Sequence, residues 1–456
     1  MSELVELVES VVGEARQGGA LGSEVSLDSS TTRRWASPLN IRSRSTQDLV
    51  ETHTDTVDAS VMVYGAGGRV GHAQTKLFSS AIDSAALSAL LSQAMSLSEA
   101  AQPNPLLGPA DKMSIGSRGL SIADPRFDRL TDEDRRDVVN WNIGTSRSVS
   151  TRIKPRRFSL SERLTRRVFA SSRGVVAEER ATLYKMTAVV GSSAREGLEL
   201  SGEVYSRHFS DVASRPLGAE LARRLEAGTR VAKMPSESLP LVIEAHVVAE
   251  ILPLITPAFD GQKLIDGESF LCGRHGEPIG PSWLHIVDDA GLASGVQTRS
   301  FDGRGVPPVA LPLICDGVAS GMYTDVLLAR ERNTRPTGHY RVDGTGWPGN
   351  LMVRPGSRTR NMLFAGLGRY LRMLNLVRPP QLDIKTGRLK LVGLFVLDGV
   401  DRSVGRVGVY SIETTIFEFF ESLIDMSSDQ TRFGMVDACT WVVQGLDLKE
   451  VSLASG

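Results

Sequence analysis

The sequence predicts an α+β protein, with a mixed α/β domain at residues 1–235 followed by a β-rich, barrel-like domain at residues 236–456. A chain of 456 residues is too long for one ordinary core, which indicates two or more domains. Helix-like and strand-like periodicities are interspersed in the first half, whereas short strand-like segments between Gly/Pro turns dominate the second. We place the boundary at residues 233–240, which are polar and include two prolines.

In the first half, local signals predict helices and a hairpin. Apolar residues at helical spacing from Leu4 to Ala15 predict a helix that ends at Gly18. Thr131 as N-cap, with Asp134 at the capping-box position, predicts the start of a helix that continues to residue 143. A glycine-rich turn predicts a hairpin between the segments 60–64 and 69–75. The other expected helices are 79–97 and 217–227, and the other expected strands are 24–27, 39–44, 157–161, 166–170 and 175–190.

In the second half, strand patterns dominate. Alternating or short apolar runs bounded by glycine and proline predict strands at 283–287, 309–314, 351–353, 389–396 and 407–412. Helices are expected at 245–255, 359–371 and 415–424. The two halves do not repeat one another in sequence, so two different domains are expected.

Charge and cysteine content narrow the classes of function. The chain has 52 basic and 53 acidic residues, a formal net charge of −1, which gives no electrostatic reason to expect binding to nucleic acid or to an anionic membrane. Its three cysteines are widely spaced and form no disulfide framework. No signal-peptide pattern opens the chain and no apolar run is long enough to span a bilayer. We expect a cytoplasmic protein.

Three segments in the second half form the most informative pattern. Residues 285–289 read His-Ile-Val-Asp-Asp, residues 301–307 read Phe-Asp-Gly-Arg-Gly-Val-Pro, and residues 313–317 read Leu-Ile-Cys-Asp-Gly. A strand that ends in paired acids is followed by a tight turn and a second strand. This order resembles the C-terminal half of the TldD/TldE family, in which TldE is also called PmbA. Other segments resemble the family's motifs in the same order: 71–75, 169–174, 335–339 and 349–356.

The resemblance also implies an absence. Zinc-bearing members of the family carry His-Glu-x-x-x-His on the helix after the first strand of the C-terminal half, and imidazoles with a thiolate bind zinc and activate its water. In our alignment, Pro253, Leu254 and Ala258 stand at the His, Glu and His positions. None of these side chains binds zinc, and the two prolines oppose a continuous helix. We expect a TldE-like chain without its own metal or catalytic residues, with zinc in a partner subunit.

Two other groups of residues could bind a metal but are incomplete. His246 and Glu250 lie one helical turn apart, without an evident third ligand. Cys272 and His275 form half of a zinc signature, which His285 and Asp288 could complete. We favour a partly buried helix histidine for the first group and a Gly/Pro turn for the second. Cys439 lacks the family's ligand setting and is expected to be a core thiol.

The expected site consists of residues that contact substrate or line a chamber. The acidic pair Asp288–Asp289 could orient a peptide amine, or it could cap a turn, which we favour. Arg304 stands where the family has Glu, at a position expected to face the chamber or the partner. The candidates are Asp288, Asp289, Asp302, Arg304, Gly305 and His339.

The resemblance implies a metal-free subunit that pairs with a TldD-like zinc subunit to hydrolyse an amide bond. The substrate would be a peptide or an N-acylated small molecule, as in antibiotic pathways. Two alternatives remain open: a self-sufficient homodimeric metallohydrolase, and a protein-interaction or regulatory protein, since the family was also described as a modulator of DNA gyrase.

Overall fold

The computed structural model describes residues 3–38, 49–115, 119–193, 198–228, 232–399 and 405–451. The strand expected at 39–44 lies outside these ranges. Ten α-helices occur in the described residues: α1 Glu3–Gln17, α2 Ser84–Ala100, α3 Asp132–Val149, α4 Phe209–Ala213, α5 Leu217–Ala227, α6 Ala245–Ile251, α7 Gly261–Ile265, α8 Val326–Glu331, α9 Arg360–Leu367 and α10 Ile416–Glu421. None of the helices in the described part of the chain combines the length and the apolar character needed to span a membrane.

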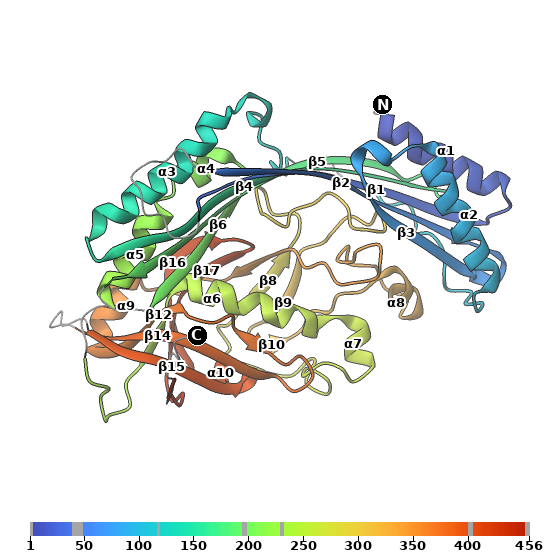
Figure 1. Cartoon of the computed structure of the whole chain (residues 1–456). Coiled ribbons are helices and arrows are strands. Elements are labelled where there is room, and N and C mark those ends of the chain that lie inside the picture. The colour runs from blue at the N-terminus through green and yellow to red at the C-terminus, as the bar shows by residue number, and fades with distance from the viewer. Residues whose placement is uncertain are drawn as a thin grey trace.

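A six-stranded antiparallel sheet is built from the first half, in the order β3-β2-β1-β4-β5-β6. Its long strands run across the top of Figure 1, above the C-terminal half, with α3 and α5 at one end and α1 and α2 at the other. The hairpin predicted across residues 60–75 is present as β2 and β3. The strands are β1 Gly22–Ala36, β2 Val50–Tyr64, β3 Val70–Phe78, β4 Ile153–Ser171, β5 Val176–Ser192 and β6 Glu199–Ser206.

A twelve-stranded mixed sheet forms the second half, in the order β10-β9-β8-β11-β17-β7-β12-β14-β15-β18, with β13 and β16 paired beside β14 and β17. The end strands β10 and β18 are not paired with each other in the described residues, so the barrel-like expectation is corrected to an open sheet. The strands are β7 Leu241–Ile243, β8 Ile286–Asp289, β9 Leu311–Cys315, β10 Val318–Ala319, β11 Asn350–Val353, β12 Arg369–Leu376, β13 Gln381–Leu382, β14 Arg388–Gly399, β15 Gly405–Thr415, β16 Leu423–Phe433, β17 Val436–Val443 and β18 Lys449–Glu450.

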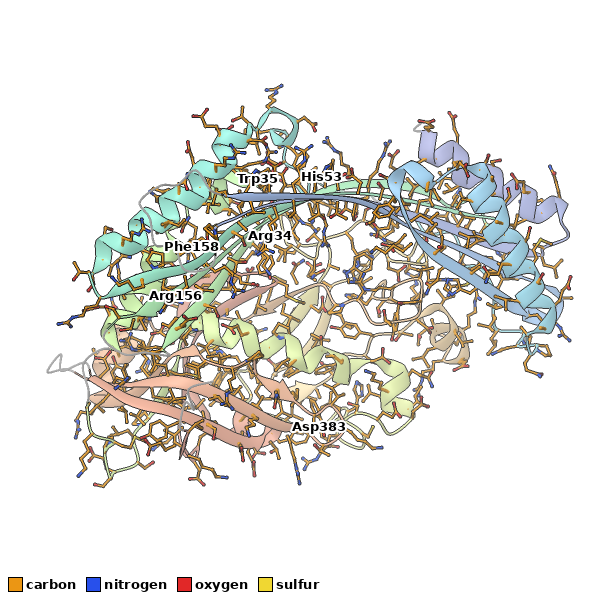
Figure 2. All side chains as sticks on the ribbon, in the orientation of Figure 1. Arg34, Trp35, His53, Arg156, Phe158 and Asp383 are labelled. Atoms are coloured by element: carbon orange, nitrogen blue, oxygen red, sulfur yellow. The ribbon has the colours of Figure 1, made fainter. Side chains whose placement is uncertain are left out.

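The α3 end of the first sheet shows how sequence and packing combine. Thr131 and Asp134 form the predicted capping box. Separate strands were expected at 157–161 and 166–170, but β4 continues through the polar residues between them. The buried Glu162 carboxylate in this polar stretch accepts a hydrogen bond from Arg135 of α3 at 2.8 Å. The Arg135 guanidinium also lies over the buried ring of Trp35, 5.1 Å from its centroid. Figure 2 labels Trp35 and Phe158 at this end of the sheet and Asp383 far below.

The two sheets share core residues. One apolar cluster combines Phe158 and Met186 of the first sheet with Leu394 and Val409 of the second. A larger cluster fills the C-terminal half around α6, β7 and β17, and a third lies between α1, α2 and the first sheet. Packing of the C-terminal strands against α3 and α5 therefore joins the two halves through apolar contact.

The helix expected at 359–371 is wrong after residue 367. The α9 helix ends at Gly368, whose φ of 66° is accessible to glycine, and β12 begins directly after it. The β12 strand lies between β7 and β14, and its sequence does not alternate apolar and polar residues, because its polar side chains stand at Arg369, Arg372 and Asn375. Polar residues at every third position do not give the alternation that identifies a strand with one buried face.

Candidate functional site

The positions that align with the zinc motif lie beyond the end of α6. The α-helix ends at Ile251, short of the end expected at residue 255, and the chain continues as a 3-10 helix over Leu252–Phe259, where the two prolines oppose an α-helix. Ala258 is fully buried in the C-terminal apolar cluster, and Leu254 packs against the same cluster. The side chains at these positions are therefore apolar and provide no zinc ligand.

Asp288 is the centre of a buried polar network at the end of β8. It has no exposed surface, and its carboxylate accepts from the Gly349 amide at 2.8 Å and from the Tyr323 hydroxyl at 2.5 Å. The fully buried His339 donates from Nδ1 to the Thr337 carbonyl at 2.8 Å, because a carbonyl can only accept. His339 Nε2 lies 3.5 Å from Asp288 Oδ1. These contacts fix the 337–349 loops against β8.

Arg299 lies near two buried acids, Asp288 and Asp302. Its guanidinium donates to the carbonyls of Gln297 at 3.1 Å and Gly338 at 3.1 Å, and it stacks on Trp347 at 4.3 Å from the ring centroid. Burial lowers the pKa of Arg299 to about 10, while the charges of Asp288 and Asp302 act to raise it. One buried cation thus compensates two neighbouring acids.

Asp302 and Gly305 shape the turn at residues 301–306. Asp302 is nearly fully buried and accepts from the amides of Arg304 at 2.8 Å and Val306 at 3.0 Å, while burial raises the pKa of its carboxyl. Gly305 has a φ of 71°, and a Cβ there would lie 2.4 Å from Phe169 Cε1 on β4. The turn is therefore pressed against the first sheet.

Arg304 binds within the chain, where the sequence suggested a chamber-facing or partner-facing side chain. Its Nε donates to buried Glu24 of β1 at 2.6 Å, and its Nη2 donates to the Tyr64 hydroxyl of β2 at 2.6 Å. Glu24 also accepts from the Ala110 amide at 2.8 Å. Arg304 therefore ties the C-terminal turn to the first sheet.

The predicted site residues therefore occupy three kinds of position. Asp288 and His339 are internal, Asp302, Arg304 and Gly305 shape and dock the turn, and Asp289 is a partly exposed turn cap that accepts from the Gly291 amide at 2.7 Å. Sequence reasoning missed Arg299, Tyr323, Trp347, Glu24 and Tyr64. These residues stand in no recognisable motif, and their partners are remote in sequence.

The two metal groups considered from the sequence do not assemble. His246 Nε2 donates to the Leu374 carbonyl at 2.9 Å, and burial lowers the pKa of His246 to about 3. Cys272 Sγ contacts the Leu264 carbonyl at 3.3 Å, and Asp288 belongs to the buried network. Cys439 is fully buried, with its Sγ 3.6 Å from Met426 Sδ, and burial raises its pKa to about 11.

A different group could hold a metal ion. Within the described ranges, His285, Cys315 and Asp316 are the one set of three or more such side chains whose ligand atoms all lie within 4.8 Å of one another. His285 precedes β8, and Cys315 and Asp316 end the neighbouring β9. Imidazole, thiolate and carboxylate are all zinc ligands. Arg354 lies 3.5 Å from Asp316, however, and its charge opposes a cation there.

Two cavities lie between the first sheet and the C-terminal half. One, of about 430 Å³, has Asp302 on its wall and is bordered by β1–β4 and the 301–303 and 341–347 loops. It combines the cations Lys76, Arg167 and Arg341 with several carboxylates and Trp347. The other, of about 470 Å³, is bordered by β5, β6, α5, α6 and the β16–β17 turn, and includes His246 and Glu250.

Comparison with known sequences matches the C-terminal half. Residues 236–450 match the family model described as the PmbA/TldA metallopeptidase C-terminal domain. Metalloprotease PmbA of Escherichia coli is 24% identical over 196 residues, which cover 41% of this chain and 44% of the relative. A metalloprotease TldD homolog of Haemophilus influenzae is 23% identical over 229 residues, 47% of each chain. The match thus spans about half the length of these curated relatives.

Solved structures show the same fold over nearly the whole chain. TldE from Thermococcus kodakarensis has a TM-score of 0.83 at 15% identity, covering 97% of this chain and 99% of TldE. A candidate modulator of DNA gyrase from Bacteroides thetaiotaomicron also has a TM-score of 0.83, at 17% identity, covering 99% and 100%. At these identities the likeness of the solved structures concerns the fold alone. Residues 236–450 of this chain match the C-terminal domain of the PmbA/TldD family, and the chain is similar in sequence to PmbA and TldD proteins over about half of its length.

Proposed function

We propose that this chain is a metal-free, TldE-like subunit that pairs with a TldD-like zinc subunit to form an amide-hydrolysing complex. The observation that carries the proposal is the composition of the motif positions: Pro253, Leu254 and Ala258 replace two ligands and a base. The 3-10 geometry and the apolar packing of this segment support the same reading. The zinc, and the water that it activates, would come from the partner.

The proposed substrate is either a peptide, which the complex would cleave in proteolysis, or an N-acylated small molecule, which it would deacetylate in antibiotic biosynthesis. The cavity of about 430 Å³ is the proposed contact surface of this subunit, because Arg341 could bind a carboxylate while Asp28 could bind an amine. Asp302 and Trp347 would form its wall. Three free cysteines support a reducing compartment such as the cytoplasm.

Co-purification with a zinc-bearing homologue from the same source tests the pairing. The mixed complex is expected to elute as one species in size-exclusion chromatography with light scattering. It should hydrolyse peptides or acylated amines, whereas this chain alone should be inactive. A zinc-bearing homologue that is fully active alone and forms no mixed species would refute the proposal.

The second candidate is a homodimeric metallohydrolase, and the His285, Cys315 and Asp316 group favours it. Cys315→Ser separates the two candidates. In a self-sufficient enzyme that uses this group, the substitution removes both bound metal and activity from the isolated protein. In a metal-free subunit, it leaves the activity of the mixed complex unchanged.

A further inference from the structure

The cavity of about 470 Å³ is lined by more carboxylates than guanidinium groups. Its ionisable side chains include three carboxylates, from Glu203, Glu220 and Glu250, and two guanidinium groups, from Arg215 and Arg224. The fully formed charges of these five groups sum to −1. His246 adds no charge near neutral pH, because burial holds its pKa at about 3.

Most of these charges are already paired. Arg215 Nε lies 2.9 Å from Glu220, and Arg224 approaches the same carboxylate at 4.0 Å. Glu203 accepts from Lys185 at 2.7 Å and from the Tyr205 hydroxyl. These ion pairs use the cations of the cavity wall and leave little capacity to bind an anion.

Glu250 is the exception. It lies on α6 with its side chain exposed to the cavity, and it makes no hydrogen bond or ion pair with the residues that the structure describes. The groups that act on its charge are Glu203 of β6, which disfavours the carboxylate, and Arg224 of α5, which favours it. Surrounding protein atoms withdraw the carboxyl from bulk water even though the residue is exposed, and this desolvation raises its pKa to about 7.

The rest of the wall is largely hydrocarbon and aromatic. Apolar side chains come from both halves of the chain: Leu183, Val204, Leu217, Ala249, Val296, Phe433 and Met435. A cavity of this size, with a largely apolar wall and one carboxylate left unpaired among its polar groups, has the properties of a small-molecule site. An ammonium ion would give the Glu250 carboxylate the partner that the protein does not supply.

We propose that this cavity binds a primary ammonium group carried on an apolar body, with the Glu250 carboxylate as the ion-pair partner. The free amino terminus of a short peptide and a small hydrophobic amine share this chemistry. The site does not include the zinc-motif positions or the cavity that contains Asp302. The inference therefore does not depend on the partner-subunit function.

Titration calorimetry of the full chain with three molecules of similar shape tests the proposal. The probes are 2-phenylethylamine, the neutral 2-phenylethanol and the anionic 3-phenylpropionate, at about pH 8, where a group of this pKa is mostly ionised. The amine is expected to bind about tenfold more tightly than the alcohol, as one charge-assisted pair allows, and the anion to bind most weakly. The dipeptide amide Phe-Gly-NH2 then distinguishes a peptide source from a small amine.

Variants assign the preference to Glu250. Glu250→Gln should bring amine and alcohol to nearly equal affinity, and Glu250→Lys should make the anion the preferred ligand. Glu268→Gln is the matched control, because Glu268 is exposed outside the cavity, and it should keep the wild-type ranking. The proposal is overturned if wild type binds none of the probes. It is equally overturned if wild type shows no preference for the amine, or if that preference survives in Glu250→Gln.

Discussion

The Arg304 guanidinium donates to the Glu24 carboxylate at 2.6 Å, although 280 positions of chain separate the two residues. Glu24 is 3% exposed, and the Tyr64 hydroxyl contacts both partners. The ion pair therefore joins the turn at 301–306 to the first two strands of the chain. The arginine in this turn makes a contact between the two halves of the same chain.

Arg304→Met is expected to destabilise the folded chain by about 3–5 kcal/mol, because it leaves the Glu24 carboxylate buried without its cation. Urea unfolding followed by tryptophan fluorescence measures the loss. In the double variant Glu24→Gln with Arg304→Met, no buried charge remains unpaired, and most of the lost stability should return. Equal losses in the single and double variants would show that the ion pair does not determine this contact.

Gly305→Ala should cost more stability than the same change at another left-handed glycine. At Gly305, with φ of 71°, the new Cβ meets Phe169 at 2.4 Å, whereas at Gly344, with φ of 81°, nothing lies within 4 Å. Gly344→Ala is expected to cost about 1–2 kcal/mol for its backbone conformation, and Gly305→Ala about 1–3 kcal/mol more for the overlap. Urea unfolding of both variants measures the difference.

Phe169→Leu provides the control for this comparison. In that background Gly305→Ala should lose part of its excess cost, since the smaller side chain vacates space near the new methyl group. If Gly305→Ala and Gly344→Ala cost the same in the wild-type background, packing of the turn against Phe169 is not the cause.

Features with local causes were predictable from the sequence. The capping box of Thr131 and Asp134 depends on residues three positions apart, and the break after α6 follows from two prolines in one segment. The β12 strand was missed because its polar residues stand at every third position and do not give the alternation that identifies a strand. The order of family motifs predicted the fold more fully than any periodicity.

The contacts of the site residues could not be predicted in the same way. The sequence placed Arg304 in a turn, but its buried partner Glu24 lies near the other end of the chain. Asp288 and His339 were recognised individually, while Tyr323 and Arg299, which complete their surroundings, stand in no motif. A buried network is defined by distances between remote segments, and one sequence without homologues contains no record of them.

The isolated chain is expected to hold no stoichiometric zinc at the motif positions, because Pro253, Leu254 and Ala258 provide no ligand atoms in their side chains. Elemental analysis after chelator-free purification measures the content. Cys315→Ala serves as the control: zinc present in wild type and lost in this variant lies at the group with His285 and Asp316. Stoichiometric zinc that persists in Cys315→Ala would not lie at that group, and its loss on replacing the segment 253–258 would contradict the prediction.

The stability of the chain should depend on pH through Glu250. Its pKa is raised from 4.5 to about 7 in the folded state, chiefly because the protein atoms around the cavity desolvate the carboxylate, with Glu203 acting in the same direction and Arg224 opposing it. Folding therefore favours the protonated form. Relative to Glu250→Gln, wild type should be most stable below about pH 4.5, and this advantage should disappear as the pH rises to about 7.

Urea unfolding of wild type and Glu250→Gln across this range measures the difference at each pH, so that titration of all other groups cancels. The same substitution at exposed Glu268 provides the comparison outside the cavity, and its difference from wild type should vary less with pH. A constant difference between wild type and Glu250→Gln would mean that water reaches the carboxyl freely and that the cavity does not disfavour its charge. A difference that grows in favour of wild type as the pH rises would mean that a cation within the chain, such as Arg224, already pairs with the Glu250 carboxylate. That result would also remove the reason to expect a ligand ammonium group at Glu250.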